Sequence, residues 1–155
     1  MKAKSIKGQT PEEIQTALLQ SMSGGFKPTL AFVFITNAED IEDVSAMLDT
    51  EGISIFGAST AEKFNEEGIE PTGIVTLLLD MKPAHFKIVL KDFGSGSVYE
   101  AANAVGEAGK KRFSHPAFII SAADISIPGG DIIKGILDKA GMDVPVNGGG
   151  AGDHV

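Results

Sequence analysis

The sequence contains no cysteine, and this absence excludes several kinds of chemistry. Without cysteine among its 155 residues, the chain forms no disulfide, offers no thiolate to a metal ion and has no thiol nucleophile. Histidine is also scarce, with three residues that form no recognisable metal-binding pattern. We therefore expect no metal site. The lack of cysteine is typical of a cytosolic protein, and we expect a cytoplasmic location.

Long apolar runs are missing as well. The longest, Gly73–Leu79, is interrupted by Thr76 and ends before Asp80, whereas a membrane-spanning helix needs about 20 apolar residues. The basic segment Met1–Lys4 is followed by a helix-capping pattern and not by an apolar stretch with a cleavage site. We therefore expect neither a membrane span nor a signal peptide.

Positive charge is in short supply. There are 13 basic against 21 acidic side chains, for a formal net charge of −8. Such a chain lacks the basic surface that general nucleic-acid binding requires. The only basic run, Lys110–Arg112, falls at the end of a predicted helix, where it complements the helix dipole.

The hydrophobic patterning predicts a single α/β domain over residues 1–155. Hydrophobic residues make up 43% of the chain, and segments with strand and helix periodicity alternate along it. One pair of strands, Thr72–Asp80 and Ala84–Lys91, is joined by a short turn and predicts an antiparallel hairpin. We expect a mixed parallel/antiparallel sheet with covering helices. The other predicted strands are 29–36, 53–56, 116–121 and 144–146, and the predicted helices begin at Pro11, after Asn37, after Ser97 and at Pro128.

An internal repeat is visible in this pattern. Ala31–Phe34 is similar to Ala117–Ile120, and Met47–Gly52 is similar to Ile136–Gly141. The pattern therefore predicts that the chain is built from two similar strand–helix–strand units. Because only the first unit is followed by a predicted hairpin, we expect the second unit to be truncated. An uncovered sheet edge would then favour a homodimer or the continuation of a longer protein.

Two of the segments rich in glycine, Gly57–Ala61 and Asn147–Asp153, end the two predicted units. Bare backbone, the hydroxyls of Ser59 and Thr60 and the Asp153 carboxylate suit a small zwitterionic ligand. The first segment also fits a capping box formed by Ser59 and Glu62, and the second also fits a frayed tail. The candidate ligand-binding residues are Gly57, Ala58, Ser59, Thr60, Asn147, Gly148, Gly149, Gly150 and Asp153.

The first glycine segment also approaches a nucleophile elbow, in which Ser59 would be the nucleophile of a small-molecule hydrolase. Such an enzyme needs a histidine base held by a carboxylate. His85 falls on the wetter face of a predicted strand, His115 precedes a proline, and His154 is the penultimate residue. None has an evident orienting acid. We therefore favour a non-enzymatic function and assign no catalytic residue.

The segment from Lys27 to Val155 resembles the N-terminal domain of FIST sensory proteins, leaving residues 1–26 as a preceding helical segment. The resemblance rests on the apolar strand Leu30–Ile35, on Ile55–Glu62, where the family favours a G-C-S-T-A-G-E pattern, and on Gly149–Asp153, which is close to G-G-x-A-G-D. The chain departs from the first pattern at Ala58, which replaces the cysteine, and lacks the glycine before the glutamate.

The resemblance implies an intracellular ligand-sensing domain of a signal transduction protein. Amino acids are among the suggested ligands of the family, and signalling output proteins are the implied partners. Some members resemble haem-binding nitric oxide sensors, so haem is an implied cofactor, although we expect none. A C-terminal FIST domain would normally follow and is absent from this sequence. The alternatives are the Ser59 hydrolase and a purely structural module of a larger FIST assembly.

Overall fold

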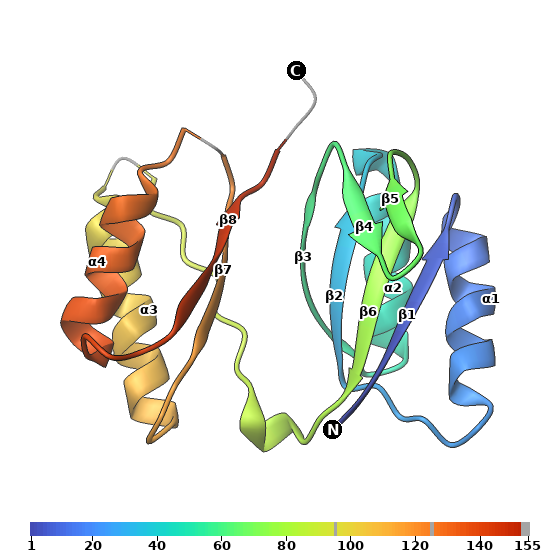
Figure 1. Ribbon diagram of the computed structural model, residues 1–155, viewed down its shortest axis with the longest axis horizontal. Helices are drawn as coiled ribbons and strands as arrows, with labels where there is room; N and C mark the ends of the chain where they lie inside the picture. The colour runs from blue at the N-terminus through green and yellow to red at the C-terminus, as the bar shows by residue number, and fades with distance from the viewer. Residues whose placement is uncertain (95, 125, 153–155) are drawn as a thin grey trace. The chain divides into compact units, whose positions relative to one another are not determined.

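The computed structural model describes residues 1–94, 96–124 and 126–152. Contacts divide the chain into two compact units, the first formed by Met1–Ile88 with Gly152 and the second by Val89–Ala151. Each is described by itself (Figure 1). Across the described residues, every helix is too short or too polar to cross a bilayer.

The first unit is built on a four-stranded mixed sheet. Its central strands are β6 and β2, and its edge strands are β1 and β3. The pair β2–β3 is parallel, whereas β6 is antiparallel to both β1 and β2. The predicted mixed sheet is therefore confirmed, with the apolar strand that follows Pro28 near its centre. The strand bounds are β1 Lys2–Gly8, β2 Leu30–Ile35, β3 Ser54–Ser59 and β6 Ile74–Asp80.

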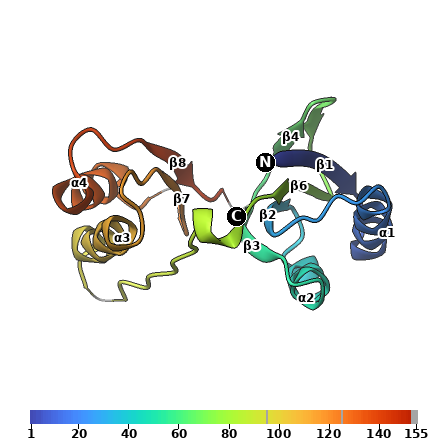
Figure 2. The same ribbon diagram turned by 90° about the horizontal axis from the view of Figure 1, so that it is seen from below.

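Two helices, α1 (Pro11–Met22) and α2 (Ile41–Thr50), cover one face of this sheet (Figure 2). Helix α1 begins as predicted, because the Thr10 hydroxyl accepts a hydrogen bond from the Glu13 amide at 3.4 Å. A single 3-10 turn, Ala38–Asp40, precedes α2. Apolar side chains of both helices and of the strands form one core, listed here: Ile14, Leu18, Phe26, Ala31, Val33, Ile35, Val44, Leu48, Ile53, Ile74 and Leu78.

A short hairpin formed by β4 (Lys63–Asn65) and β5 (Gly68–Glu70) follows β3. Its turn is closed by the Asn65 side chain, whose Oδ1 accepts hydrogen bonds from the amides of Glu67 at 2.8 Å and Gly68 at 3.2 Å. This is the local bonding that makes asparagine a turn residue. The hairpin stands over the face of the sheet opposite α1 and α2 (Figure 2).

The predicted hairpin between Thr72–Asp80 and Ala84–Lys91 is wrong. Strand β6 pairs with β1 and β2 instead. The chain after it forms a 3-10 turn, Pro83–His85, and no strand over residues 86–93. The physical reason is competition for the edges of β6: residues from the N-terminus and from β2 occupy both, so a further strand has no backbone partner there.

The second unit consists of a parallel strand pair and two helices. Strands β7 (Phe118–Ala122) and β8 (Val146–Gly150) pair in parallel, and α4 (Gly129–Ala140) connects them. Helix α3 (Val98–Arg112) packs against α4, and both cover the same face of the pair (Figure 2). Ala102, Phe118, Ile136 and Ala140 form its core. The interpretation of the two units as a repeat stays a prediction.

The helical periodicity of the sequence predicts that Ile41 and Ile133 face inward, but both side chains are exposed. Ile41 of α2 is 39% exposed and Ile133 of α4 is 46% exposed. In α4 the residues Ile132, Ile136 and Ala140, spaced four apart, contact the core, and Ile133 lies about 100° around the helix from Ile132. In α2, Ile41 is the first residue of the helix and directly follows the 3-10 turn. The buried residues of this helix begin only at Val44.

The α3–α4 contact depends on glycine. A Cβ added to Gly106 of α3 would lie 2.6 Å from the carbonyl oxygen of Ile136 in α4. We therefore expect Gly106→Ala to lower the free energy of unfolding by about 1–3 kcal/mol, because the helices must move apart. Gly130→Ala is the control: this helical glycine has nothing within 4 Å, so alanine there should be neutral or stabilise by up to about 1 kcal/mol. Urea unfolding measures both, and equal effects would contradict the packing.

Candidate functional site

The segment Gly57–Ser59 is not a turn, although glycine and serine are typical turn residues. It is the last half of strand β3, in register with Val33–Ile35 of β2. The backbone hydrogen bond from the Thr60 amide to the Ile35 carbonyl, at 2.9 Å, extends the pairing by one more residue. The strand continues because its backbone groups find partners on β2, which outweighs the local tendency of glycine and serine to turn.

Neither the capping box nor the nucleophile elbow forms after Ser59. Both require a helix directly after this residue, and the next element is β4. Thr60 instead forms an isolated parallel bridge with Gly152, whose carbonyl accepts a hydrogen bond from the Ala61 amide at 3.1 Å. The Thr60 hydroxyl donates to the Glu62 carbonyl at 2.8 Å.

Gly57 has a structural reason to be glycine. A Cβ at this position would lie 2.0 Å from the carbonyl oxygen of its partner Val33, well inside van der Waals contact. Strands β2 and β3 can approach as they do only without a side chain there. The backbone at this point is exposed, and Ala58, Ser59 and Thr60 are half-buried.

The second glycine segment is also a strand and not a frayed tail. Asn147–Gly150 belongs to β8 and pairs in parallel with Ile119–Ala122. Gly148 has φ = 143°, and a Cβ there would lie 2.0 Å from the Ile120 carbonyl oxygen, whereas a Cβ on Gly149 would meet nothing within 4 Å. The predicted ligand-binding residue Asp153 lies outside the described residues.

The two groups of predicted site residues belong to different units. The contacts that fix Gly57–Thr60 lie in the first unit, and those that fix Asn147–Gly150 lie in the second. Each group lies toward the carboxyl end of one strand and pairs with the backbone of the parallel neighbouring strand. Their roles in ligand binding stay a prediction.

Sequence reasoning missed a lysine close to the first of these groups. Lys63, the first residue of β4, is 4% exposed, and its ammonium donates a hydrogen bond to the hydroxyl of Thr36. Thr36 directly follows the last residue of β2, as Thr60 follows the last residue of β3. The carboxyl ends of the parallel pair therefore carry two threonine hydroxyls and a buried cation. The segment Glu62–Glu67 looks solvent-exposed in the sequence, so only the tertiary fold reveals this burial.

An open hollow of about 620 Å³ lies elsewhere in the first unit, beside β1 and α1. Lys4, Gln20 and Glu66 are among its polar lining residues. The Lys4 ammonium donates to the Ser21 carbonyl at 2.5 Å and lies 5.1 Å from the centre of the Phe26 ring. These contacts hold the lysine against the protein, and the hollow is wide and shallow.

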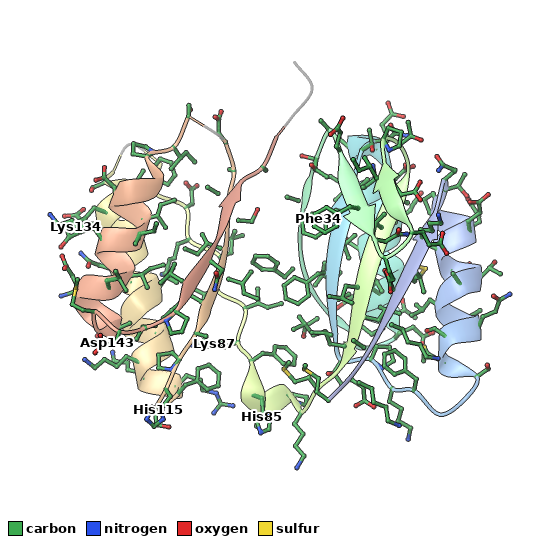
Figure 3. The ribbon with its side chains drawn as sticks, viewed as in Figure 1. Phe34, His85, Lys87, His115, Lys134 and Asp143 are labelled. Atoms are coloured by element: carbon green, nitrogen blue, oxygen red, sulfur yellow. The ribbon has the colours of Figure 1, made fainter. Side chains whose placement is uncertain are left out.

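The histidines offer little support for metal or haem binding. His85 ends an exposed 3-10 turn, and exposed His115 precedes β7 with its Nδ1 3.1 Å from the Ser114 hydroxyl (Figure 3). His154 lies outside the described residues. Exposed side chains of this kind lack the enclosed pocket in which haem is ligated. Within residues 1–94, 96–124 and 126–152, no three histidine, aspartate or glutamate side chains gather as a metal site.

Comparison with known proteins gives one match. The model of the FIST N domain family matches residues 29–155, a range that includes both glycine segments, Thr36 and Lys63. No curated protein and no solved structure matches the chain.

Proposed function

This chain belongs to the FIST N domain family, a family of sensory domains in signal transduction proteins, and we propose that it binds an amino acid or related metabolite. The ligand is held at the carboxyl ends of the parallel strands. In the first unit Gly57–Thr60 bind it, and in the second unit Asn147–Gly150 occupy the corresponding position in the parallel pair. Ligand binding is transmitted to a C-terminal FIST domain or to signalling output proteins in the cytoplasm.

One structural feature supports this proposal most directly. Both parallel pairs contain a glycine whose Cβ would lie 2.0 Å from a carbonyl oxygen of the neighbouring strand, Gly57 beside Val33 and Gly148 beside Ile120. In α/β proteins, ligands bind outside the carboxyl ends of parallel strands. Where a strand carries glycine, no side chain shields the backbone from a small polar molecule.

The side chains next to these glycines suit a zwitterion. Ser59 and Thr60 provide hydroxyls that can accept a hydrogen bond from an ammonium group or donate one to a carboxylate. Neither hydroxyl carries a charge, so a net-neutral ligand is not repelled. The formal net charge of −8, in contrast, disfavours polyanionic ligands.

A thermal-shift screen of amino acids and related metabolites tests the proposal. At a concentration near ~100 times Kd, a specific ligand should add about 2.7 kcal/mol to the free energy of unfolding. We expect Thr60→Val to reduce this gain. Thr50→Val is the matched control, because the Thr50 hydroxyl also donates to a carbonyl of its own segment, that of Ala46, at 2.8 Å. If none of the compounds stabilises the protein, the proposed function is wrong.

A further inference from the structure

Lys63 is a cation that the fold removes from water. It is 4% exposed, although it belongs to a three-residue strand of a small hairpin. Taking an ammonium group out of water costs several kcal/mol unless an opposite charge compensates it. A lysine kept in such a place needs either an internal counter-ion or an external one.

Two acids of the hairpin, Glu67 and Glu70, are already engaged. Glu70 is the cross-strand partner of Lys63 in the hairpin, but the Glu70 carboxylate is 2.5 Å from the ammonium of Lys7. Glu67 is also bound to Lys7, at 2.6 Å. Lys7 thus takes two of the three carboxylates of the hairpin, and the ion pairs found among the described residues include none to Lys63.

A hydroxyl is what Lys63 contacts instead. Its Nζ donates to Thr36 Oγ1, and a neutral hydroxyl satisfies one N–H group without neutralising the charge. Burial lowers the pKa of Lys63, and attraction to Glu70 opposes this only in part. The ammonium is therefore desolvated and undercompensated in the ligand-free protein.

The position of this pair matches the proposed ligand site. Thr36 follows β2 and Thr60 follows β3, and the Thr60 amide bonds to the carbonyl of Ile35, the residue before Thr36. We infer that Lys63 and Thr36 recognise the carboxylate of the ligand, an inference that rests on the function proposed above.

The test uses acetate as the probe and acetamide as its uncharged analogue. The full chain is melted in sodium acetate, in acetamide, in sodium phosphate and in sodium chloride, all at one ionic strength. We expect acetate to raise the melting temperature by several degrees over chloride, and acetamide to have no such effect. An equal rise with phosphate and acetate overturns the inference, because it shows general anion binding.

Lys63→Met removes the charge and keeps an unbranched side chain of similar length. We expect it to abolish the acetate effect while leaving the ligand-free melting temperature unchanged or higher, since an undercompensated charge is lost. Lys27→Met, which removes the same charge from an exposed residue, should keep the acetate effect. If Lys63→Met fails to fold, Thr36→Val serves instead and should weaken the acetate effect.

The outcomes separate this inference from the proposed function. If amino acids stabilise the protein as strongly as their amides, and Lys63→Met still responds, the inference is wrong and the function stands. If acetate acts through Lys63 but no metabolite in the screen stabilises the protein, the carboxylate site stands and amino-acid sensing is wrong. A Lys63→Met protein that is less stable and a wild type indifferent to acetate would show that the lysine is purely structural.

Discussion

Gly148→Ala is expected to destabilise the second unit by at least about 3 kcal/mol, beyond the usual cost of overpacking. The added Cβ would lie 2.0 Å from the carbonyl oxygen of Ile120, and the residue has φ = 143°, a conformation that side chains other than glycine rarely adopt. Both the backbone of β7 and that of β8 would have to move. No rotation of a side chain can relieve a clash between a Cβ and a neighbouring backbone.

Gly149→Ala is the matched control, one residue further along the same strand. A Cβ there meets nothing within 4 Å, and its φ is not in the left-handed region. Its effect should therefore stay within about 0.5 kcal/mol, as for other surface substitutions. Gly57→Ala should behave like Gly148→Ala, since its Cβ would lie 2.0 Å from the Val33 carbonyl oxygen. Denaturant unfolding followed by circular dichroism measures all three, and a mild effect of Gly148→Ala would contradict the β7–β8 register.

Leu78→Ala is expected to cost about 2–5 kcal/mol of the free energy of unfolding. Leu78 is 0% exposed and belongs to the core between the four-stranded sheet and its two helices. Truncation leaves a cavity under α1 and α2, which the surrounding strands fill only in part. The same urea titration gives the value.

Leu77→Ala provides the internal comparison for that substitution. Leu77 is the preceding residue of β6, points to the opposite face and is 40% exposed. Its loss should cost clearly less, about 1 kcal/mol or below. Equal losses for both leucines would mean that β6 is shifted by one residue relative to β2, because such a slip exchanges the two faces.

The elements with strong local signals were predicted from the sequence. Helix α1 has proline at its first position and a threonine cap, and α4 begins directly after Pro128, close to the predicted start. The run of apolar residues in β2 is typical of a central strand that is buried on both faces, and β2 lies between β6 and β3 in the sheet. These signals act over a few residues, so they can be recognised in the sequence without the tertiary structure.

The elements that depend on distant partners were not predicted from the sequence. Strand β1 has three lysines within Lys2–Gly8 and too few apolar residues to indicate a strand, yet it pairs with β6 over its whole length. Charged residues of this kind are typical of edge strands. The three-residue strands β4 and β5 are too short to show a period, although Asn65 and Gly68 mark the turn between them.

The candidate site stays a prediction, and the structure corrects only the local conformation of its residues. The sequence pointed to Gly57–Thr60 and Asn147–Gly150, and the structure places both at the ends of parallel strands. Glycine and serine suggested turns there, because local propensity says nothing of the backbone partners that hold these residues extended. Lys63 could not be found in this way, since its burial is produced by strands that lie far from it in the sequence.

The most direct test of the account is a titration of the ¹⁵N-labelled protein, followed by NMR, with the compound that stabilises it most in the thermal-shift screen. Binding at the carboxyl ends of the strands should give the largest amide shift changes at Gly57–Thr60 and at Thr36, and changes at Gly148–Gly150 would include the second unit in the site. Largest changes around Lys4 and Gln20, beside the hollow at β1 and α1, would contradict the proposed site.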